Sequence, residues 1–547
     1  MAAPSNQVAV PAPGNQGLNT EMSPFQADQQ FALRADNAVI DRVGRLACRE
    51  AFADHIPRSS IPGNYDLVRM ASIEGGDFSN DAVFAIAGQG RKMVNRKNVP
   101  SGMVEDSVYN LEIVDFSEYI GVYIDNNVVA ELPSVRPSNG VSNCQLVPFK
   151  DAVYIFSKGD APMVFKDGAA TKLSDAPGYL PPQDDDGIIA QELDGDVACA
   201  AYGRLWVSGV NDDYNTIYYS DLLIPEQWYD GKGTPTDAQN TAGIIKVDEY
   251  WPTGSDKIQG IAAHNGFLVV FGRHSILIYS GAQGDPAAEG GLKLEDAIRD
   301  VGLVNQDAMC NIGTEHMFVD SLGVRALGRV IQEKSTPLAE PSLNVATEIR
   351  ELIDTQSDTV RMMHLPRKSL AVCLFPEIGE AFVFQLGQPS TTGGYKVTRW
   401  TGCDFYDSIT ARTDKDTLTL MAGRNSRGIT KYDGYKQPKP YEFNYESPVV
   451  NVTGNLMQTI IPKNMSYSFV SSRNYNINAT WGFGAEMNKS QRVKPRNQAG
   501  DSGFQTSSIS MNGSGTMLRV GLQASISGDL LSIQQITINT QVGRVIV

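Results

Sequence analysis

The stretch NGFLVVFGRHSILIYSG, residues 265–281, decides the fold class of this chain. It holds two short apolar runs, FLVVF and SILIYS, which are separated by a glycine and two polar residues. Apolar runs of this length, bounded by glycine and polar residues, are typical of buried β-strands. Two such runs across a short turn predict a β-hairpin.

The same pattern recurs along the chain. Further copies are residues 151–168 (DAVYIFSKGDAPMVFKDG), 203–221 (GRLWVSGVNDDYNTIYYSD), 315–328 (EHMFVDSLGVRALG), 369–387 (SLAVCLFPEIGEAFVFQLG) and 416–434 (DTLTLMAGRNSRGITKYDG), with a weaker copy at 81–95 (DAVFAIAGQGRKMVN). The clear copies follow one another about every 50 residues, which is a propeller-blade period. Leu205, Leu268 and Leu370 hold matching positions in three of them.

A single hairpin is marginally stable in water, so its apolar face must pack against neighbours. Radially arranged blades achieve this packing and leave only short sheet edges. We therefore expect an all-β chain with a six- or seven-bladed β-propeller over residues 61–440, in which each copy supplies the two inner strands of a blade. Apolar stretches before some copies, such as 257–262 and 308–312, supply another strand. The alternative is an ordinary two-sheet β protein with coincidental spacing.

Two regions fall outside the repeat. Residues 1–60 are predicted to form an N-terminal docking segment with a helix at 32–52, because Ala38, Val39, Val43, Leu46 and Ala47 recur at helical spacing. Residues 441–547 are rich in Asn, Ser, Thr and Gln. Alternating stretches at 466–470, 517–522 and 531–538 predict strands of a sandwich-like β domain there.

A second helix is expected inside the repeat region, at residues 344–354. Val345, Ile349, Leu352 and Ile353 would line one face of it, and Asn344 would cap its N-terminus.

Composition narrows the class of function. The 547 residues carry a formal net charge of -16, which argues against a protein that grips nucleic acid through its phosphates. The 6 cysteines form no CxxC pair, and the 5 histidines show no metal-binding spacing. We find no P-loop, no Gly-x-Ser-x-Gly and no sialidase-type Asp-box in the sequence. The sequence therefore predicts no catalytic residue, no cofactor and no metal, and its apolar runs are too short to span a membrane.

The densest charge lies in residues 183–196 (QDDDGIIAQELDGD), between two hairpin copies. Its acidic residues are Asp184, Asp185, Asp186, Glu192, Asp194 and Asp196. One interpretation is a solvated loop. The other is an electronegative channel lining, because like charge keeps a passing polyanion from sticking.

Several stretches resemble, in order, the tail nozzle proteins of short-tailed bacteriophages (podoviruses), also called tail tubular protein B or the tail hub. The opening GLNTEMSP (17–24) and DNAVIDRVGRLACRE (36–50) is similar to the start of that family. The hairpins at 203–228 and 260–281, the order SLGVRALGR (321–329) then RMMHLPRKSLAVCLF (361–375), and the ending GDLLSIQQITINTQVGRVIV (528–547) continue the resemblance. The acidic insertion at 183–196 has no counterpart in it.

The resemblance implies a virion structural protein of the phage tail that assembles in the host cytoplasm. Such proteins form a homo-hexameric ring that docks under an adaptor ring, supports tail fibres or spikes, and surrounds the channel through which genomic DNA is ejected without specific binding. The N-terminal segment and the C-terminal region are expected to supply much of the ring contact. The competing interpretations are a propeller enzyme that degrades polysaccharide, a receptor-binding protein, and a cellular propeller scaffold.

Overall fold

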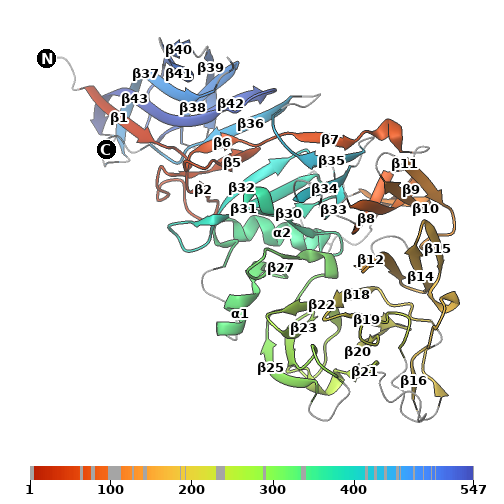
Figure 1. Cartoon of the computed structure of the whole chain (residues 1–547). Helices are drawn as coiled ribbons and strands as arrows, with labels where there is room; N and C mark the ends of the chain where they lie inside the picture. Colours follow the sequence, from red (N-terminus) through yellow and green to blue (C-terminus); the bar gives the residue numbers. More distant parts are fainter. Residues whose placement is uncertain are drawn as a thin grey trace.

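The computed structural model describes most of the chain. The described residues are 5–61, 66–74, 81–95, 112–125, 128–138, 144–184, 187–190, 192–228, 241–286, 291–333, 340–403, 405–412, 417–423, 428–435, 440–450, 452, 455, 457–471, 473, 475–484, 486–493, 496–498 and 501–545. The molecule is elongated, with a propeller at one end and a sandwich at the other, where both termini lie (Figure 1).

Seven antiparallel blades follow one another through the middle of the described chain, so the predicted all-β propeller is confirmed with seven blades; six are separate sheets, and blade 6 is part of a larger sheet. Blade 1 consists of β8 (Asp66–Ile73), β9 (Ala82–Asn95), β10 (Glu112–Asp125) and β11 (Val128–Leu132), and blade 2 of β12 (Cys144–Phe149), β13 (Ala152–Ser157), β14 (Asp160–Lys166) and β15 (Ala169–Lys172). Blade 3 consists of β18 (Val197–Ala201), β19 (Arg204–Val210), β20 (Asp213–Tyr219) and β21 (Gly243–Lys246). Blade 4 consists of β22 (Ile258–His264), β23 (Phe267–Gly272), β24 (Ser275–Ser280) and β25 (Lys293–Arg299). Blade 5 consists of β26 (Met309–Asn311), β27 (His316–Asp320) and β28 (Gly323–Ala326). Blade 6 consists of β29 (Arg361–Leu365), β30 (Leu370–Phe375), β31 (Glu380–Pro389) and β32 (Tyr395–Thr401). Blade 7 consists of β33 (Phe405–Arg412), β34 (Thr417–Gly423), β35 (Ile429–Tyr432) and β7 (Phe52–Ile56).

The ring of blades is closed. The first strand of each blade lies innermost, so that β8 packs against β12, β12 against β18, β18 against β22, β26 against β29, and β29 against β33, which returns to β8. Blades 4 and 5 meet through the short helix η6 (Gln306–Ala308). The predicted hairpins are therefore the second and third strands of their blades, which are the two inner strands of each four-stranded sheet, as predicted. The apolar stretches that precede them, such as β22 and β26, form the innermost strands.

One expectation about the hairpins needs correction. Residues 81–95 are not a hairpin but mostly the single strand β9, which pairs along its length with β10. Leu205, Leu268 and Leu370 all lie in second strands, which confirms their matching positions, although they pack toward different neighbouring blades. Leu205 packs in a cluster with blade 2 and Leu268 in one with blade 3, the preceding blades, whereas Leu370 packs with residues of blade 7, the following blade.

The helix predicted at 32–52 is wrong, because this segment forms short strands. They are β3 (Phe31–Ala32), which pairs with β2 (Gly17–Leu18), β4 (Arg34–Asp36), β5 (Ala38–Ile40) and β6 (Leu46–Cys48), followed by β7. A tight turn joins β5 to β6: Asp41 Oδ1 accepts hydrogen bonds from the Val43 and Arg45 amides, and Gly44 has a φ of 82°. The helical spacing of the apolar residues arose from a hairpin with its own turn.

The N-terminal segment joins the propeller to the sandwich. Strand β7 pairs with β35 and completes blade 7, whereas β4 lies between β32 of blade 6 and β36 (Tyr441–Glu446). One nine-stranded sheet therefore runs from blade 6 through β4 and β36 to β42 (Leu518–Ile526), β38 (Ile477–Phe483) and β39 (Glu486–Val493). Strands β4 and β7 of the N-terminal segment therefore pair with other strands of the same chain. The docking role of residues 1–60 stays a prediction.

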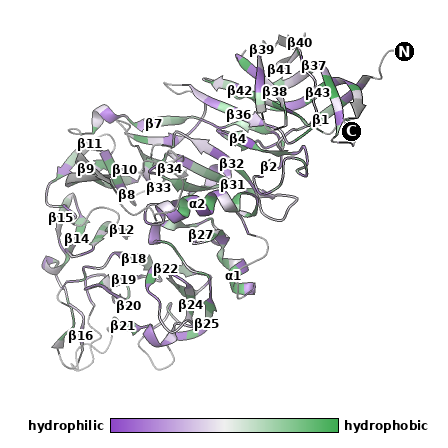
Figure 2. Cartoon of the chain, turned by 180° about the vertical axis from the view of Figure 1, so that it is seen from behind, coloured by the Kyte–Doolittle hydropathy of each residue, from purple (hydrophilic) through white to green (hydrophobic). Residues whose placement is uncertain are grey.

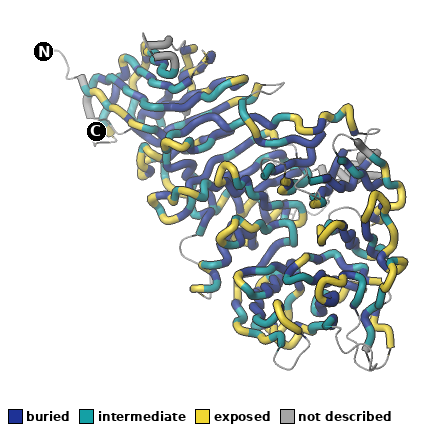
Figure 3. Tube along the Cα trace, viewed as in Figure 1, coloured by how far each residue is buried: buried dark blue, intermediate teal, exposed yellow. Residues whose placement is uncertain are grey.

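The C-terminal sandwich is confirmed. Its second sheet contains β40 (Arg496–Gln498), β41 (Asp501–Ser510), β37 (Gln458–Val470), β43 (Ser532–Val545), β6 and β5, with β1 (Ser5–Pro11) on β43. The predicted strands at 466–470, 517–522 and 531–538 fall in β37, β42 and β43. Apolar residues of both sheets, including Tyr467, Phe469 and Trp481, pack in one core. Buried chain fills the interiors of propeller and sandwich (Figure 3), and apolar and polar residues alternate along many strands (Figure 2).

Helices are few in the described residues. They are α1 (Leu327–Glu333), α2 (Ala346–Gln356) and the short turns η1 (Arg58–Ser60), η4 (Leu173–Asp175), η5 (Asp248–Tyr250), η6, η7 (Leu343–Val345) and η8 (Pro366–Lys368). No helix in this part of the chain has the length and apolar character needed to cross a membrane.

Helix α2 confirms the helix predicted at 344–354, but Asn344 does not cap it. The Asn344 side chain instead binds Asn19, Ser390 and Thr392. Glu21 of the N-terminal segment accepts hydrogen bonds from the Thr347 amide, at 2.6 Å, and from the Thr347 hydroxyl, at 2.9 Å.

Candidate functional site

The acidic insertion at 183–196 was the candidate site predicted from the sequence. In the structure its residues lie in different places. Strands β16 (Gln183–Asp184) and β17 (Gly187–Ile188) form a short hairpin that lies at the outer edge of the propeller, beyond β21 and far from the innermost strand β18 (Figure 1). Asp185 and Asp186 lie outside the described residues. Glu192 is exposed.

Asp194 and Asp196 are tied into the blades. The Asp194 carboxylate accepts a hydrogen bond from the amide of Asn211, at 2.9 Å, in the turn between β19 and β20. Asp196 accepts one from the Tyr214 hydroxyl at 3.1 Å, and its burial raises the pKa of the carboxyl. Both carboxylates thus hold blade 3 together. Lining of an assembled channel by the six acidic residues stays a prediction.

Asn211 and Asp212 form the polar turn of the hairpin between β19 and β20. Both residues have positive φ values, 53° and 62°, which a type I′ hairpin turn requires. No group of three or more potential metal ligands occurs among the described residues.

The propeller axis carries a cluster of charges that sequence reasoning missed. We call it the axial network; it consists of Arg69 on β8, Gln145 on β12, Asp307 in η6, Arg361 on β29 and Asp407 on β33. These residues come from blades 1, 2, 5, 6 and 7 and are far apart in sequence, each without a local motif. The innermost strands bring them together because the first strand of every blade borders the axis.

The contacts of the axial network centre on Asp307. Its Oδ2 atom lies 2.7 Å from an Arg69 nitrogen and 3.3 Å from an Arg361 nitrogen, and its Oδ1 accepts a bond from Gln145 at 3.4 Å. Arg361 also lies 3.5 Å from Asp407, whose other oxygen accepts a bond from the Met70 amide at 2.8 Å. The four charged side chains are 4–20% exposed.

The two carboxyls of the axial network differ in their electrostatics. Burial alone would raise the pKa of Asp307, but the guanidinium groups of Arg69 and Arg361 hold it below its ordinary value. Burial raises the pKa of Asp407, and Arg361 and Arg69 offset this only partly. Two arginines and two aspartates therefore bind one another across the axis.

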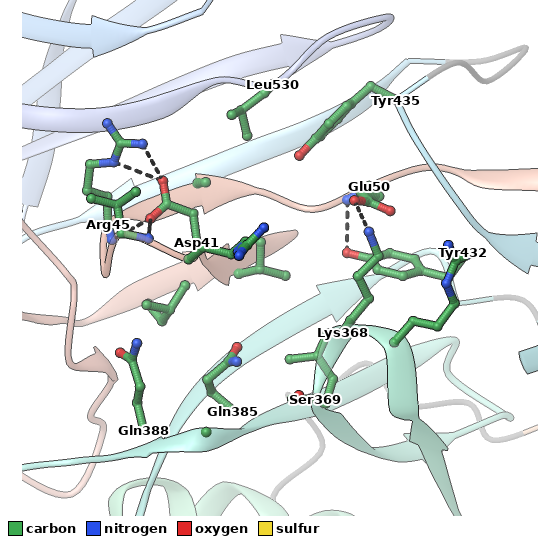
Figure 4. A pocket seen from close by; sticks show the side chains of 18 residues that line it. Asp41, Arg45, Glu50, Lys368, Ser369, Gln385, Gln388, Tyr432, Tyr435 and Leu530 are labelled. Atoms are coloured by element: carbon green, nitrogen blue, oxygen red, sulfur yellow. Dashed lines mark hydrogen bonds and ion pairs between the residues drawn. The ribbon is translucent and has the colours of Figure 1, made fainter. Parts of the chain in front are cut away.

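A groove lies where the propeller meets the N-terminal strands and the sandwich (Figure 4). We call it the junction groove. Its volume is about 720 Å³, and it runs between the β5–β6 turn, η8, β31 and Leu530. Its charged lining residues are Asp41, Arg42, Arg45, Glu50, Arg367 and Lys368, which leaves a formal charge of +2 in a chain of -16.

Two ion pairs shape the junction groove. Arg45 binds Asp41 at 2.8 Å, and Lys368 binds Glu50 at 2.5 Å (Figure 4). The amide of Glu50 also donates to the Tyr432 hydroxyl. Arg42 is exposed at the β5–β6 turn, beside Val43, which is 75% exposed. The groove can therefore accept an anionic segment with apolar neighbours.

The sequence matches no protein-family model and no curated protein. Solved structures share only a distant likeness. The WD40 domain of Pan2 from Neurospora crassa is 7% identical, with a TM-score of 0.34 over 68% of this chain and 91% of that one. YCF48 bound to a D1 peptide is 8% identical, with a TM-score of 0.32 over 68% and 93%. PorZ of the Porphyromonas gingivalis type-IX secretion system is 11% identical, with a TM-score of 0.36 over 82% and 55%. Such low similarity carries no functional argument.

Proposed function

We propose that this chain is a structural protein of a short-tailed phage virion, the tail nozzle. About six copies form a closed ring that docks to an adaptor ring and supports fibres or spikes. Genomic DNA passes through the hole between the copies and is not bound specifically. The proposal rests on the ordered resemblance of the sequence to nozzle proteins.

The observation that carries the mechanical part of the proposal is the axial network. Paired arginines and aspartates from four blades, with Gln145 from a fifth, meet at the propeller axis, so each propeller acts as a solid wall element. The continuous nine-stranded sheet ties this element rigidly to the sandwich. A wall built from such rigid bodies surrounds a conduit between chains rather than through each propeller.

The net charge of -16 favours passage of DNA over retention. Like charge along the conduit repels the phosphates weakly, and screening limits the effect to about 8–10 Å at physiological salt. A basic conduit would instead hold DNA through many salt-sensitive contacts.

Native mass spectrometry of the full-length chain tests this function. We expect closed rings of about six chains at micromolar concentration, with or without the adaptor ring. A monomer under both conditions would contradict the nozzle function and favour a propeller enzyme or a cellular scaffold.

A further inference from the structure

A pair of buried histidines lies where blade 4 meets blade 5. His264 ends β22 of blade 4 and His316 begins β27 of blade 5, and their ring centroids are 5.6 Å apart. The two residues are only 9% and 8% exposed. We call them the histidine pair.

Side chains hold these two blades together. The Gln306 side chain in η6 accepts a hydrogen bond from the Ile261 amide at 2.9 Å and donates to the Ile261 carbonyl at 3.2 Å. Phe271 of blade 4 packs on Phe318 of blade 5, with ring centroids 5.2 Å apart. The histidine pair adds a third contact across the same boundary.

Hydrogen bonds fix the tautomers of both rings. The Nε2 atom of His316 lies 2.9 Å from the Ala263 carbonyl oxygen, which can only accept, so this nitrogen carries the proton. The Nδ1 atom of His316 is then a bare acceptor, and it is buried without a hydrogen-bond partner. The side-chain amide of Asn265 donates to His264 Nε2 at 3.1 Å. The closed contact therefore holds two neutral rings.

Within the described residues, neither ring has an acidic partner. Burial lowers the pKa of His264. Burial also lowers the pKa of His316; the bond to the Ala263 carbonyl opposes this shift, and the His264 ring adds to it. A proton on either ring would therefore stay uncompensated while the blades are in contact.

The titratable groups on the surrounding elements do not change this balance. They are the side chains of Cys199 and Tyr202 in blade 3, which pack in a cluster with Ala263, and of Cys310 on β26. Burial raises the pKa of each of the three, so they stay uncharged near neutral pH. The carboxylate of Glu315, the neighbour of His316 in sequence, lies beside Gly328 of α1.

Protonation of either ring breaks the closed arrangement. A proton on His316 Nδ1 creates a buried charge and an N–H group without an acceptor, and a proton on His264 Nε2 removes the bond from Asn265. We propose that the histidine pair is a pH-sensitive closure of the propeller, which joins blades 4 and 5 at neutral pH and lets them separate in mild acid. The closure lies within one chain, so it does not depend on ring assembly by several copies.

The direction of the two shifts sets the pH window. Each histidine has a lower pKa in the closed contact than in the open one, where the value is about 6.5. The stabilisation is therefore complete well above about pH 6.5 and is lost as the pH falls toward the closed-state value. From about pH 7.5 to about pH 5.5, protonation of the open form raises the opening equilibrium about tenfold for each histidine that stays neutral when closed.

Hydrogen–deuterium exchange of the full-length chain at these two pH values tests the proposal, after correction for the intrinsic pH dependence of exchange. We expect protection of residues 258–264 and 309–320 to fall by about tenfold or more in acid, while residues 204–219 of blade 3 keep theirs. His264→Gln combined with His316→Gln should remove the fall, because glutamine supplies the same donor and acceptor but does not titrate. His274→Gln, an exposed site on blade 4, is the matched control and should keep the full response.

Three results would overturn the proposal: protection that does not change with pH, an equal loss in blade 3, or a fall that persists in the double glutamine variant. Should that variant fail to fold, the ring NMR signals of the wild type decide. His264 and His316 must stay neutral for as long as blades 4 and 5 remain protected. A ring of the pair that titrates at about pH 6.5 or above in the closed protein rules the closure out.

Discussion

Buried arginines are held in two different ways in this molecule. At the propeller axis, Arg69 and Arg361 bind the carboxylates of Asp307 and Asp407. At the junction with the sandwich, Arg49 lies over aromatic rings: its Cζ atom is 4.5 Å from the Phe52 centroid and 4.1 Å from the Tyr441 centroid. The first arrangement depends on ionised partners. The second depends on ring faces and on neutral oxygens.

Arg49 connects three parts of the chain at the junction. It donates from Nε to Asn37 Oδ1 at 2.9 Å, packs on Phe52 of β7, and faces Tyr441 of β36. The ring centroid of Trp400 in blade 6 lies 5.9 Å from the Arg49 Cζ atom. The comparison teaches that the axis should respond to pH, whereas the junction should depend on the planar shape of one guanidinium.

The largest effect is expected for Asp307→Asn. The change leaves Arg69 and Arg361 without their shared carboxylate, and breaking a buried ion pair costs about 3–5 kcal/mol. We expect a loss of unfolding free energy of about 3 kcal/mol, the low end, because the Asp307 side chain is 20% exposed. Urea unfolding at pH 7 measures it. A loss below the scatter of surface variants would show that the axial network does not stabilise the ring.

At acidic pH, the difference in unfolding free energy between the wild type and Asp307→Asn should become smaller. The folded-state pKa of Asp307 is lowered, so its stabilisation is present above the unfolded pKa of about 3.9 and is lost as pH falls through the folded value. Unfolding midpoints of both proteins between pH 7 and pH 3 measure the gap. A gap that stays constant or widens in acid would contradict the sign of this shift.

Arg49→Lys should destabilise the junction by about 1–2 kcal/mol. Lysine keeps the charge but lacks the planar group that stacks on Phe52 and Tyr441. Thermal unfolding in low and high salt measures the change, which we expect to be nearly independent of salt. Wild-type stability in Arg49→Lys would mean that charge alone holds the junction.

Asp407→Asn is the matched control for the axis and should have the smallest effect, about 1 kcal/mol or less. Burial raises the pKa of Asp407, so its charge is a cost at neutral pH that a neutral amide avoids. The asparagine oxygen can still accept from the Met70 amide. Urea unfolding beside Asp307→Asn compares the two positions. Equal losses at both would remove the distinction between the two carboxyls.

Local patterns predicted much of this fold. The hairpin of β23 and β24 is visible in sequence because its strands are neighbours and a short polar turn joins them. The strands of the sandwich and helix α2 were found from the spacing of apolar residues within each segment. Residues 32–52 were mistaken for a helix because the β5–β6 hairpin and its turn gave a helical spacing of apolar residues. The flanking strands have remote partners: β4 lies between β32 and β36, and β7 pairs with β35.

The axial network was beyond local sequence reasoning. Arg69, Asp307, Arg361 and Asp407 are single charges in different blades, and only the closed ring brings them together. The available signal was the polar residue within or just before an inner strand, as at Asp307 before β26. The acidic insertion was conspicuous in sequence, yet Asp194 and Asp196 hold turns of blade 3.

A cryo-electron microscopy reconstruction of the assembled full-length chain tests the central claim most directly. We predict a closed ring with one open hole between the copies, wide enough for duplex DNA. The axis of each propeller should be filled by density from Arg69, Asp307 and Arg361. A particle without a central hole, or a ring whose propeller axes are open while the space between copies is closed, would contradict the account.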